Sequence, residues 1–322
     1  MKLVIQIPCL NEQETLPVTL ADLPRSLPGV EAIETLVIDD GSTDATSEVA
    51  RRHGVTRVVR FAARRGLARA FDTGLREALA MGADVIVNTD ADNQYVGADI
   101  AKLVEPILER RADMVVGSRP IGSIAHFSGF KKLLQRLGSA VVRALSASDV
   151  PDATSGFRAY SREAALRLTV LTGFTYTLET LIQASQKNLA IAHVPIRVNG
   201  KLRESRLFRG MGSYITRSLG TMARVYLLYR PLRFFFTLAA GFLLAGLALF
   251  VRFLYLYLTT PGQTGHVQSL IVAGALAVMG TLLLALGVLA DLTAMNRRLL
   301  EELVVNSRLE RLDRGRAERG TG

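Results

Sequence analysis

Residues 85–95 read VIVNTDADNQY, an apolar run that becomes polar at Asn88 and then carries two carboxylates and two further amides. The run 85–87 is typical of a buried strand. Asp90 and Asp92 follow directly after it. Turns after strands are often polar for structural reasons alone. This segment therefore leaves open whether its carboxylates bind a ligand or close a turn.

Short apolar runs alternate with helical stretches from residue 1 to about residue 199. We expect strands at 3–7, 34–38, 55–61 and 84–87, and helices at 13–23, 44–53 and 68–81. This alternation predicts an α/β fold, a mainly parallel Rossmann-like sheet with helices on both faces. Ser42 or Thr43 is the expected N-cap of helix 44–53.

Three polar clusters follow expected strands, at 8–12, 39–44 and 90–94. In open parallel sheets ligands bind outside the carboxyl ends of the strands. We therefore expect the three clusters to converge on one crevice. Their coincidence favours a binding site over three unrelated structural turns.

The charge of the chain is unevenly distributed. Lysine and arginine number 39 against 29 aspartates and glutamates, and residues 201–233 hold eight basic residues against one acid. Such a block suits an anionic membrane surface or phosphate groups. Nucleic acid is the rival partner, but the block has no RNA-binding aromatic motif and continues into apolar sequence, which favours lipid. Cys9 is the single cysteine, which excludes an intrachain disulfide and a cysteine-based zinc site.

Two segments free of charge, 234–251 and 267–290, have the length that a transmembrane helix needs. We expect them to form a hairpin of helices at about 233–257 and 267–291; a pair of buried helices in a soluble protein is the alternative. Arginines flank the outer ends of the pair, whereas the connecting turn has only Arg252. The positive-inside rule then predicts that both termini face the cytoplasm. The N-terminal apolar run is too short for a signal peptide.

A family resemblance rests on six segments: IPCLNE (7–12), VIDDGSTD (37–44), RGLARAFDTGL (65–75), NTDADNQY (88–95), GSR (117–119) and SGFRAYSRE (155–163). They occur in the order found in family 2 inverting glycosyltransferases, which have the GT-A fold. The chain more closely resembles the polyprenyl-phosphate sugar synthases, a subgroup that includes dolichyl-phosphate mannose synthase and the bacterial undecaprenyl-phosphate glucosyltransferases. The resemblance covers about two-thirds of the chain, and the expected hairpin resembles the anchor of the bacterial subgroup.

The carboxylates of Asp90 and Asp92, at spacing i and i+2, can face one hard cation, with Gln94 adding an amide oxygen. Such an ion neutralises a nucleotide diphosphate for binding and for departure. The resemblance implies Mg²⁺ or Mn²⁺ at these three residues. The alternative is an Asp-rich turn that caps the following helix.

The resemblance also implies which residues contact the donor, a UDP-hexose or GDP-hexose: Pro8, Asn11, Glu12, Asp39, Asp40, Arg65, Gly66 and Ala91. Carboxylates are suitable acceptors for base and ribose donors. For Asp40, closure of the Asp-Gly-Ser turn is the alternative role. Leu10 stands where the family usually has an aromatic residue, so this position supplies no ring to stack on the base.

A polyprenyl phosphate already carries a negative oxygen, so it needs no strong base to deprotonate it. It needs cations that hold the phosphate in line with the anomeric carbon of the sugar. The resemblance implies that this phosphate is bound by Arg119, by either Lys131 or Lys132, and by Arg206. For the two lysines, general attraction to the membrane is the alternative. The resemblance places the sugar and acceptor region at Ser155, Gly156, Arg158, Tyr176 and Glu179. Arg158 is either structural or faces the phosphate.

Together these features predict a membrane-anchored, metal-dependent transferase that moves a hexose, glucose or mannose, to a polyprenyl phosphate, with Asp90, Asp92 and Arg119 as catalytic residues. The expected parts are a cytoplasmic catalytic domain (1–199), basic juxtamembrane helices (200–232), the two spans (233–291) and a cytoplasmic helix and tail (292–322). The resemblance further implies a homo-oligomer, a dimer or tetramer. The alternatives are a processive polysaccharide synthase, which predicts more spans and a tryptophan motif, and a non-catalytic nucleotide-sugar-binding scaffold.

Overall fold

The computed structural model describes residues 1–119, 150–170, 176–200, 227, 231–259 and 267–320, without the side chains of 298 and 311–320. The chain divides into two compact units, Met1–Ile215 with Val304–Gly322, and Thr216–Leu303. Lys131, Lys132, Arg206 and nearly all of the basic segment 200–232 lie outside the described residues.

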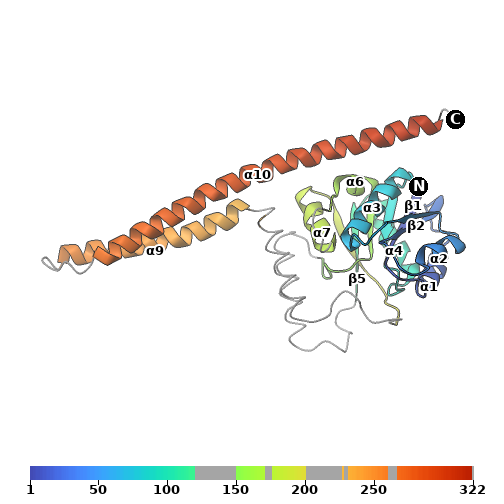
Figure 1. Cartoon of the computed structure of the whole chain (residues 1–322), viewed down its shortest axis with the longest axis horizontal. Helices are drawn as coiled ribbons and strands as arrows, with labels where there is room; N and C mark the ends of the chain where they lie inside the picture. The colour runs from blue at the N-terminus through green and yellow to red at the C-terminus, as the bar shows by residue number, and fades with distance from the viewer. Residues whose placement is uncertain (120–149, 171–175, 201–226, 228–230, 260–266, 321–322) are drawn as a thin grey trace. The chain divides into compact units, whose positions relative to one another are not determined.

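The first unit contains one sheet, which among the described residues has seven strands (Figure 1). They are β1 (Lys2–Cys9), β2 (Ala32–Asp39), β3 (Arg57–Arg60), β4 (Val85–Asn88), β5 (Met114–Ser118), β6 (Arg158–Ser161) and β7 (Ile191–Pro195). Their order is β3-β2-β1-β4-β6-β5-β7. All pairs are parallel except those that β6 makes with β4 and β5. The predicted mainly parallel α/β sheet is confirmed.

Helices cover both faces of this sheet (Figure 1). They are α1 (Leu16–Asp22), α2 (Thr46–Arg52), α3 (Leu67–Ala80), the short 3₁₀ turn η1 (Gly97–Asp99), α4 (Ile100–Leu108), α6 (Arg162–Arg167) and α7 (Tyr176–Gln186). Leu3, Ile5 and Ile7 of β1 pack in one core with residues of α1, α2 and α4. The alternate residues, such as Gln6, face α3, where Gly74 approaches the Gln6 side chain. A strand covered on both faces is apolar throughout, which explains why β1 reads as a nearly continuous apolar run.

Helix α2 begins later than the sequence suggests. Its N-cap is Ala45, so the prediction of Ser42 or Thr43 as the cap is wrong. Both residues are held by the loop after β1, because the Asn11 amide donates to Ser42 Oγ (2.9 Å) and the Thr43 amide donates to Asn11 Oδ1 (2.8 Å). Asp44 accepts from the Thr46 amide at 3.0 Å, as a cap would. Contacts with a distant loop thus override the local capping signal.

A buried carboxylate joins the start of α4 to the chain that follows β7. Asp99 accepts from the Arg197 amide (2.6 Å) and from Arg197 Nη2 (2.9 Å), and it pairs with Lys102 Nζ at 2.9 Å. Burial by itself would raise the pKa of Asp99, but the hydrogen bonds from Arg197 and Lys102 outweigh it and lower the pKa to about 2. The ionised form therefore stabilises the folded protein.

We predict that Asp99→Asn lowers the unfolding free energy at pH 7 by about 1–2 kcal/mol, a value reduced for the solvent-exposed cationic partners. The unfolded-state pKa of aspartate is about 3.9 and the folded-state value is lower. The difference should therefore be full above about pH 4 and should disappear as the pH falls toward 2. Thermal unfolding in detergent at several pH values measures it. The control Glu109→Gln removes an exposed pair with Arg111 and should change stability little; an equal loss at every pH for Asp99→Asn would contradict this account.

The second unit contains most of two long helices, α9 (Pro231–Thr259) and α10 (Val267–Gly320). Both are long and apolar enough to cross a membrane, with a mean hydropathy of 2.4 in their most apolar windows. Little of this surface is buried: large side chains such as Leu244, Leu258 and Leu289 are more than half exposed. Exposed apolar surface of this extent is typical of a lipid-facing segment. The alternative of two buried helices in a soluble protein is therefore disfavoured.

Small residues let α9 and α10 approach closely. A Cβ atom at Gly246 would lie 3.1 Å from the Ala273 carbonyl oxygen, and one at Gly280 would lie 2.6 Å from Leu243 Cγ. Ala239 is fully buried, whereas the neighbouring Leu238 is exposed. Transmembrane helices commonly pack through such positions, because no hydrophobic effect drives them together within lipid.

We predict that the full chain stays in the membrane pellet after an alkaline carbonate wash, because lipid-exposed helices are not released by loss of ionic contacts. The measurement is immunoblotting of pellet and supernatant, with a soluble marker protein as the control. Recovery in the supernatant would contradict the membrane-spanning interpretation.

Candidate active site

The loops that follow β1, β2 and β4 begin at the same edge of the sheet. Cys9 pairs with Asp39 across β1 and β2, and Gln6 pairs with Asn88 across β1 and β4. A side chain from α1 joins them, because Thr19 Oγ1 donates to the Ala91 carbonyl oxygen at 3.0 Å. The three polar clusters therefore leave the sheet at one edge, as predicted; that they line one crevice stays a prediction.

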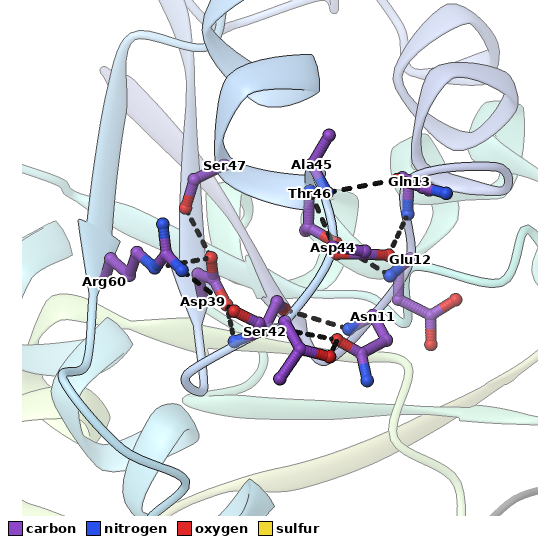
Figure 2. A network of polar contacts seen from close by, with 11 residues as sticks. Asn11, Glu12, Gln13, Asp39, Ser42, Asp44, Ala45, Thr46, Ser47 and Arg60 are labelled. Atoms are coloured by element: carbon purple, nitrogen blue, oxygen red, sulfur yellow. Dashed lines mark hydrogen bonds and ion pairs between the residues drawn. The ribbon is translucent and has the colours of Figure 1, made fainter.

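Asn11 ties the loop after β1 to the loop after β2 (Figure 2). Its amide donates to Ser42 Oγ, and its Oδ1 accepts from the Thr43 amide and from Thr43 Oγ1 (3.3 Å). Asn11 has φ = 56°, in the left-handed region that asparagine tolerates better than most residues. An asparagine therefore serves here both for its backbone conformation and for its amide oxygen.

Further hydrogen bonds interlock the same two loops (Figure 2). The Glu12 amide donates to Thr46 Oγ1 (2.8 Å), the Gln13 amide to Asp44 Oδ2 (3.2 Å), and the Ala45 amide to Gln13 Oε1 (3.0 Å). The carboxylate of Glu12 is buried and accepts from Thr15 Oγ1 at 2.7 Å. Pro8 lies within β1 itself. These contacts join the loop after β1 to the loop after β2.

The carboxylates of Asp39 and Asp40 accept hydrogen bonds from other residues of the chain. Asp39 is fully buried: it accepts from the Ser42 amide at 2.7 Å and from Ser47 Oγ, and its Oδ2 lies 3.6 Å from Arg60 Nε (Figure 2). Asp40 accepts from the amides of Arg65 (2.6 Å) and Gly66 (2.9 Å), just before α3. The Arg65 guanidinium lies 5.0 Å from the centre of the Phe61 ring. The predicted alternative, in which Asp40 closes the Asp-Gly-Ser turn, is therefore wrong: Asp39 accepts from the Ser42 amide, whereas Asp40 binds the loop before α3.

Asp90 lies against the segment before β6. A Cβ atom at Gly156 would be 3.2 Å from Asp90 Oδ1 and 2.8 Å from the Tyr176 hydroxyl oxygen. Asn88 Nδ2 donates to the Gly156 carbonyl oxygen (2.8 Å) and to the Tyr176 hydroxyl (3.0 Å), and Gln6 Nε2 donates to Asn88 Oδ1 (2.8 Å). Buried amides thus hold Gly156 and Tyr176 beside Asp90.

Two tyrosines support this contact from either side. The Tyr176 ring stacks on Phe71 with centroids 4.0 Å apart, and Tyr95 stacks on Phe157 at 4.8 Å. The Tyr95 hydroxyl accepts from the Gly156 amide at 3.3 Å. Burial, reinforced by the negative charge of Asp90, raises the pKa of both tyrosines. Both hydroxyls therefore remain protonated hydrogen-bonding groups at neutral pH.

The residues around Asp92 suit a divalent cation that takes its remaining coordinating oxygens from a bound ligand. Asp92 Oδ1 accepts from the Gln94 amide at 3.1 Å, and Asn93 between them has φ = 53°. Among the described residues, no three or more His, Cys, Asp or Glu side chains gather in a cluster that could hold a metal. Mg²⁺ is commonly held by one or two carboxylates with phosphate oxygens and water. Asp90 and Asp92, both only partly buried, fit that arrangement.

Arg119 follows β5 and pairs with a carboxylate. Its Nε donates to Asp152 Oδ2 at 2.6 Å and its Nη2 to Asp152 Oδ1 at 3.1 Å. Burial opposes the charge of each partner, but the pair outweighs it: the pKa of Asp152 is lowered and that of Arg119 is raised. The negative charge of Asp90 also raises the pKa of Arg119. Arg119 and Asp90 therefore belong to one electrostatic neighbourhood.

Arg158 is fully buried, and its contacts favour the structural alternative. Its guanidinium donates to four oxygens, the carbonyls of Ala153 (2.6 Å), Ser155 (2.7 Å) and Thr177 (2.7 Å) and the hydroxyl of Thr180 (3.1 Å). It thereby ties the turn that contains Ser155 and Gly156 to the start of α7. Glu179, in the first turn of α7, is also buried and accepts from Gln183 Nε2 at 3.4 Å.

Sequence reasoning missed Asn88, Tyr95 and Asp152 as parts of this site. Asn88 precedes the acidic motif and Tyr95 follows it. The available signal for Asn88 was a polar residue at the end of a buried strand. For Asp152 the signal was indirect: a partly buried arginine usually has an acidic partner, which need not be near in sequence.

Comparison with known proteins gives a match to one family model. The model described as Glycosyl transferase family 2 matches residues 4–169. The undecaprenyl-phosphate mannosyltransferase of Micrococcus luteus is 30% identical over 66% of this chain and 89% of its own length. The polyprenol monophosphomannose synthase of Mycolicibacterium smegmatis is 26% identical over 60% of this chain and 76% of its own.

Among solved structures, the chain is similar to glucosyl-3-phosphoglycerate synthase from Mycobacterium tuberculosis, crystallised with Mn²⁺, uridine diphosphate and glucosyl-3-phosphoglycerate. The TM-score is 0.52 at 23% identity, and the match covers 70% of this chain and 78% of that one. This likeness shows a shared fold, that of the GT-A transferases.

We predict that Gly41→Ala destabilises the protein by about 3 kcal/mol, because it combines a strained backbone with a steric clash. Gly41 has φ = +75°, and a Cβ atom there would lie 2.7 Å from the Ala63 carbonyl carbon and 2.7 Å from the Arg64 amide nitrogen. Gly54 is a matched control, with φ = +73° and nothing within 4 Å of its Cβ position. Gly54→Ala should cost about 1 kcal/mol. Equal thermal shifts for the two variants would show that the approach of residues 63–64 is unimportant.

Proposed function

Because the chain belongs to glycosyl transferase family 2, we propose that it transfers a hexose from a nucleotide-sugar to a polyprenyl phosphate, with inversion at the anomeric carbon. The observation that carries this proposal is that one short segment, 152–156, binds Arg119 through Asp152 and lies against Asp90 at Gly156, on a chain that also has two helices long and apolar enough to cross a membrane. Two relatives whose names specify mannose and a polyprenyl or undecaprenyl acceptor support it and favour mannose over glucose.

The chemistry asks little of a base. An anionic oxygen of the lipid phosphate attacks the anomeric carbon, and a new carbon–oxygen bond forms on the face opposite the donor. The bond to the donor phosphate breaks, and its electron pair leaves with the nucleoside diphosphate. Since the attacking oxygen carries no proton, the protein has to position two anionic groups and to screen their charges.

Asp90, Asp92 and Gln94 would hold Mg²⁺ or Mn²⁺, the second of which is bound in the structural relative described above. Such an ion supplies charge neutralisation to the diphosphate when it is bound. Asn88 and Gly156 position the Asp90 side of this site through the hydrogen bonds of the buried amide network.

For the donor, UDP-hexose or GDP-hexose, we propose the loops built by Asn11, Glu12, Asp39 and Asp40, with Arg65, Gly66 and Ala91 at their margins. Asp39 and Asp40 would shape these loops through their internal hydrogen bonds. Glu12 is the buried carboxylate nearest in sequence to the Asn11 turn and would accept from the nucleoside.

The two apolar helices would place this site beside the lipid head groups. Arg233 and Arg297 lie near the outer ends of the spans, and Arg252 lies near the connecting turn. The arginine distribution in the sequence supports a hairpin whose catalytic domain and termini face the cytoplasm. A lipid phosphate remains at head-group depth, so an anchored enzyme meets it there.

The test incubates membranes that contain the protein with labelled GDP-mannose, UDP-glucose or GDP-glucose, with Mn²⁺ and either undecaprenyl or dolichyl phosphate. Label should move into the organic extract with at least one donor, GDP-mannose being our expectation. No lipid-linked label with any combination would contradict the proposal and would favour a non-catalytic scaffold.

We predict that Asp92→Ala lowers kcat about 100-fold or more, because a ligand to the diphosphate-bound ion is lost. The control Glu109→Ala removes an exposed acid at the end of α4 and should leave the rate unchanged. Thermal unfolding checks that both variants are folded. Full activity of Asp92→Ala at limiting Mn²⁺ would refute its metal role.

A further inference from the structure

Asp152 is a buried acid whose partner is an arginine of the proposed acceptor site. Its side chain is 1% exposed, whereas that of Arg119 is 22% exposed. Thr154 closes a triangle with them: its hydroxyl donates to Asp152 Oδ1 at 2.9 Å and accepts from Arg119 Nη2 at 3.2 Å. The pair therefore has a fixed buried side and an accessible cationic side.

The pairing determines which edge of the guanidinium can meet a ligand. A guanidinium is planar, so two bonds to one carboxylate fix the direction of its remaining N–H groups. In Arg119 the Nε and Nη2 atoms bind Asp152. Within the part of the chain that the structure describes, Nη1 of Arg119 makes no hydrogen bond. Nη1 is thus the donor that is left for an anion.

The backbone around Asp152 connects this edge to Asp90. Asp152 and Gly156 belong to one short segment before β6, and the Gly156 position lies against the Asp90 carboxylate. Strand β5, which ends just before Arg119, runs parallel to β4, because both are antiparallel to β6. Arg119 and Asp90 therefore leave the sheet at the same edge. One segment contacts both the cationic and the acidic wall of the site.

We propose that Asp152 is a positioning residue: it holds the Nε and Nη2 edge of Arg119 so that Nη1 points at the acceptor phosphate in line with the sugar. This inference rests on the proposed function and adds a residue to it. Asp152 also offsets part of the cationic charge, which weakens general attraction of anions. Its contribution is therefore one of direction, and its loss should reduce kcat without weakening acceptor binding.

The first test compares Asp152→Asn and Asp152→Glu with the full-length parent protein in detergent, with GDP-mannose and undecaprenyl phosphate. We expect kcat to fall about 10- to 100-fold in both variants, because misplacement by about 1 Å can cost that much. The KM for undecaprenyl phosphate should stay the same or fall in Asp152→Asn, since a negative charge has gone. A raised KM with unchanged kcat, or full recovery by Asp152→Glu, would overturn the proposal.

A double-mutant cycle separates positioning from a direct role. If Asp152 acts only through Arg119, Asp152→Asn should cause no further loss of kcat in an Arg119→Gln background. If the kcat losses of the two single variants multiply in the double variant, the proposal is overturned. Glu77→Gln is the control, because it removes another carboxylate paired with an arginine, Arg57, near the C-terminal end of α3 and at the first residue of β3. It should lower thermal stability while leaving kcat unchanged.

A measurement that does not depend on turnover separates the pairing of Asp152 with Arg119 from the role of that pair in sugar transfer. Phenylglyoxal modifies guanidinium groups, and peptide mass spectrometry locates the adduct. Arg119 should react slowly in the parent protein and faster in Asp152→Asn; equal reactivity would overturn the pairing. Slow reaction in a parent protein that transfers no sugar would overturn the positioning role and the proposed function, while the pairing itself would stand.

Discussion

The hydrogen-bond register of β1 with its two neighbours is the constraint on which the site depends. Because Cys9 pairs with Asp39 and Gln6 with Asn88, the loops that follow these strands begin at one level. A slip by one residue would turn every side chain to the opposite face of the sheet. The buried Gln6–Asn88 hydrogen bond opposes such a slip, since a slip would separate the Gln6 Nε2 donor from the Asn88 Oδ1 acceptor inside the protein. The same bond that fixes the register also orients Asn88 toward Gly156 and Tyr176.

Much of the fold could be predicted from the sequence, because alternating apolar runs and helical stretches carry a periodic signal. The convergence of the loops after β1, β2 and β4 followed from parallel topology alone. The reversed direction of β6 could not be read, since a four-residue strand has no signal for its direction. The pairing of Arg119 with Asp152 joins residues 33 positions apart, and such side-chain contacts leave no periodic trace. The N-cap of α2 was mispredicted for a similar reason, because Asn11 in another loop holds Ser42 and Thr43.

Two arginines of the candidate site, Arg119 and Arg158, are stabilised in different ways. Arg119 is bound by the carboxylate of Asp152, so the pair carries little net charge. The hydrogen bonds of Arg158 described above go to carbonyl and hydroxyl oxygens. These oxygens satisfy its donors while leaving its positive charge uncompensated by them. In a medium of low dielectric constant such a charge acts over a longer distance than at the surface. Arg158 thus gives the turn at Ser155 and Gly156 both its shape and a positive potential.

The loops after β1 and β2 are joined to each other by hydrogen bonds of Asn11 and Asp44, and Asp40 joins the second loop to Gly66. The Asp40 carboxylate accepts hydrogen bonds from the amides of Arg65 and Gly66, which could otherwise bind a phosphate oxygen. The conformational entropy of ordering these loops is therefore lost during folding and not during donor binding. An incoming nucleotide would meet a rigid receptor, and its association should be limited by diffusion and desolvation rather than by a slow rearrangement of the chain.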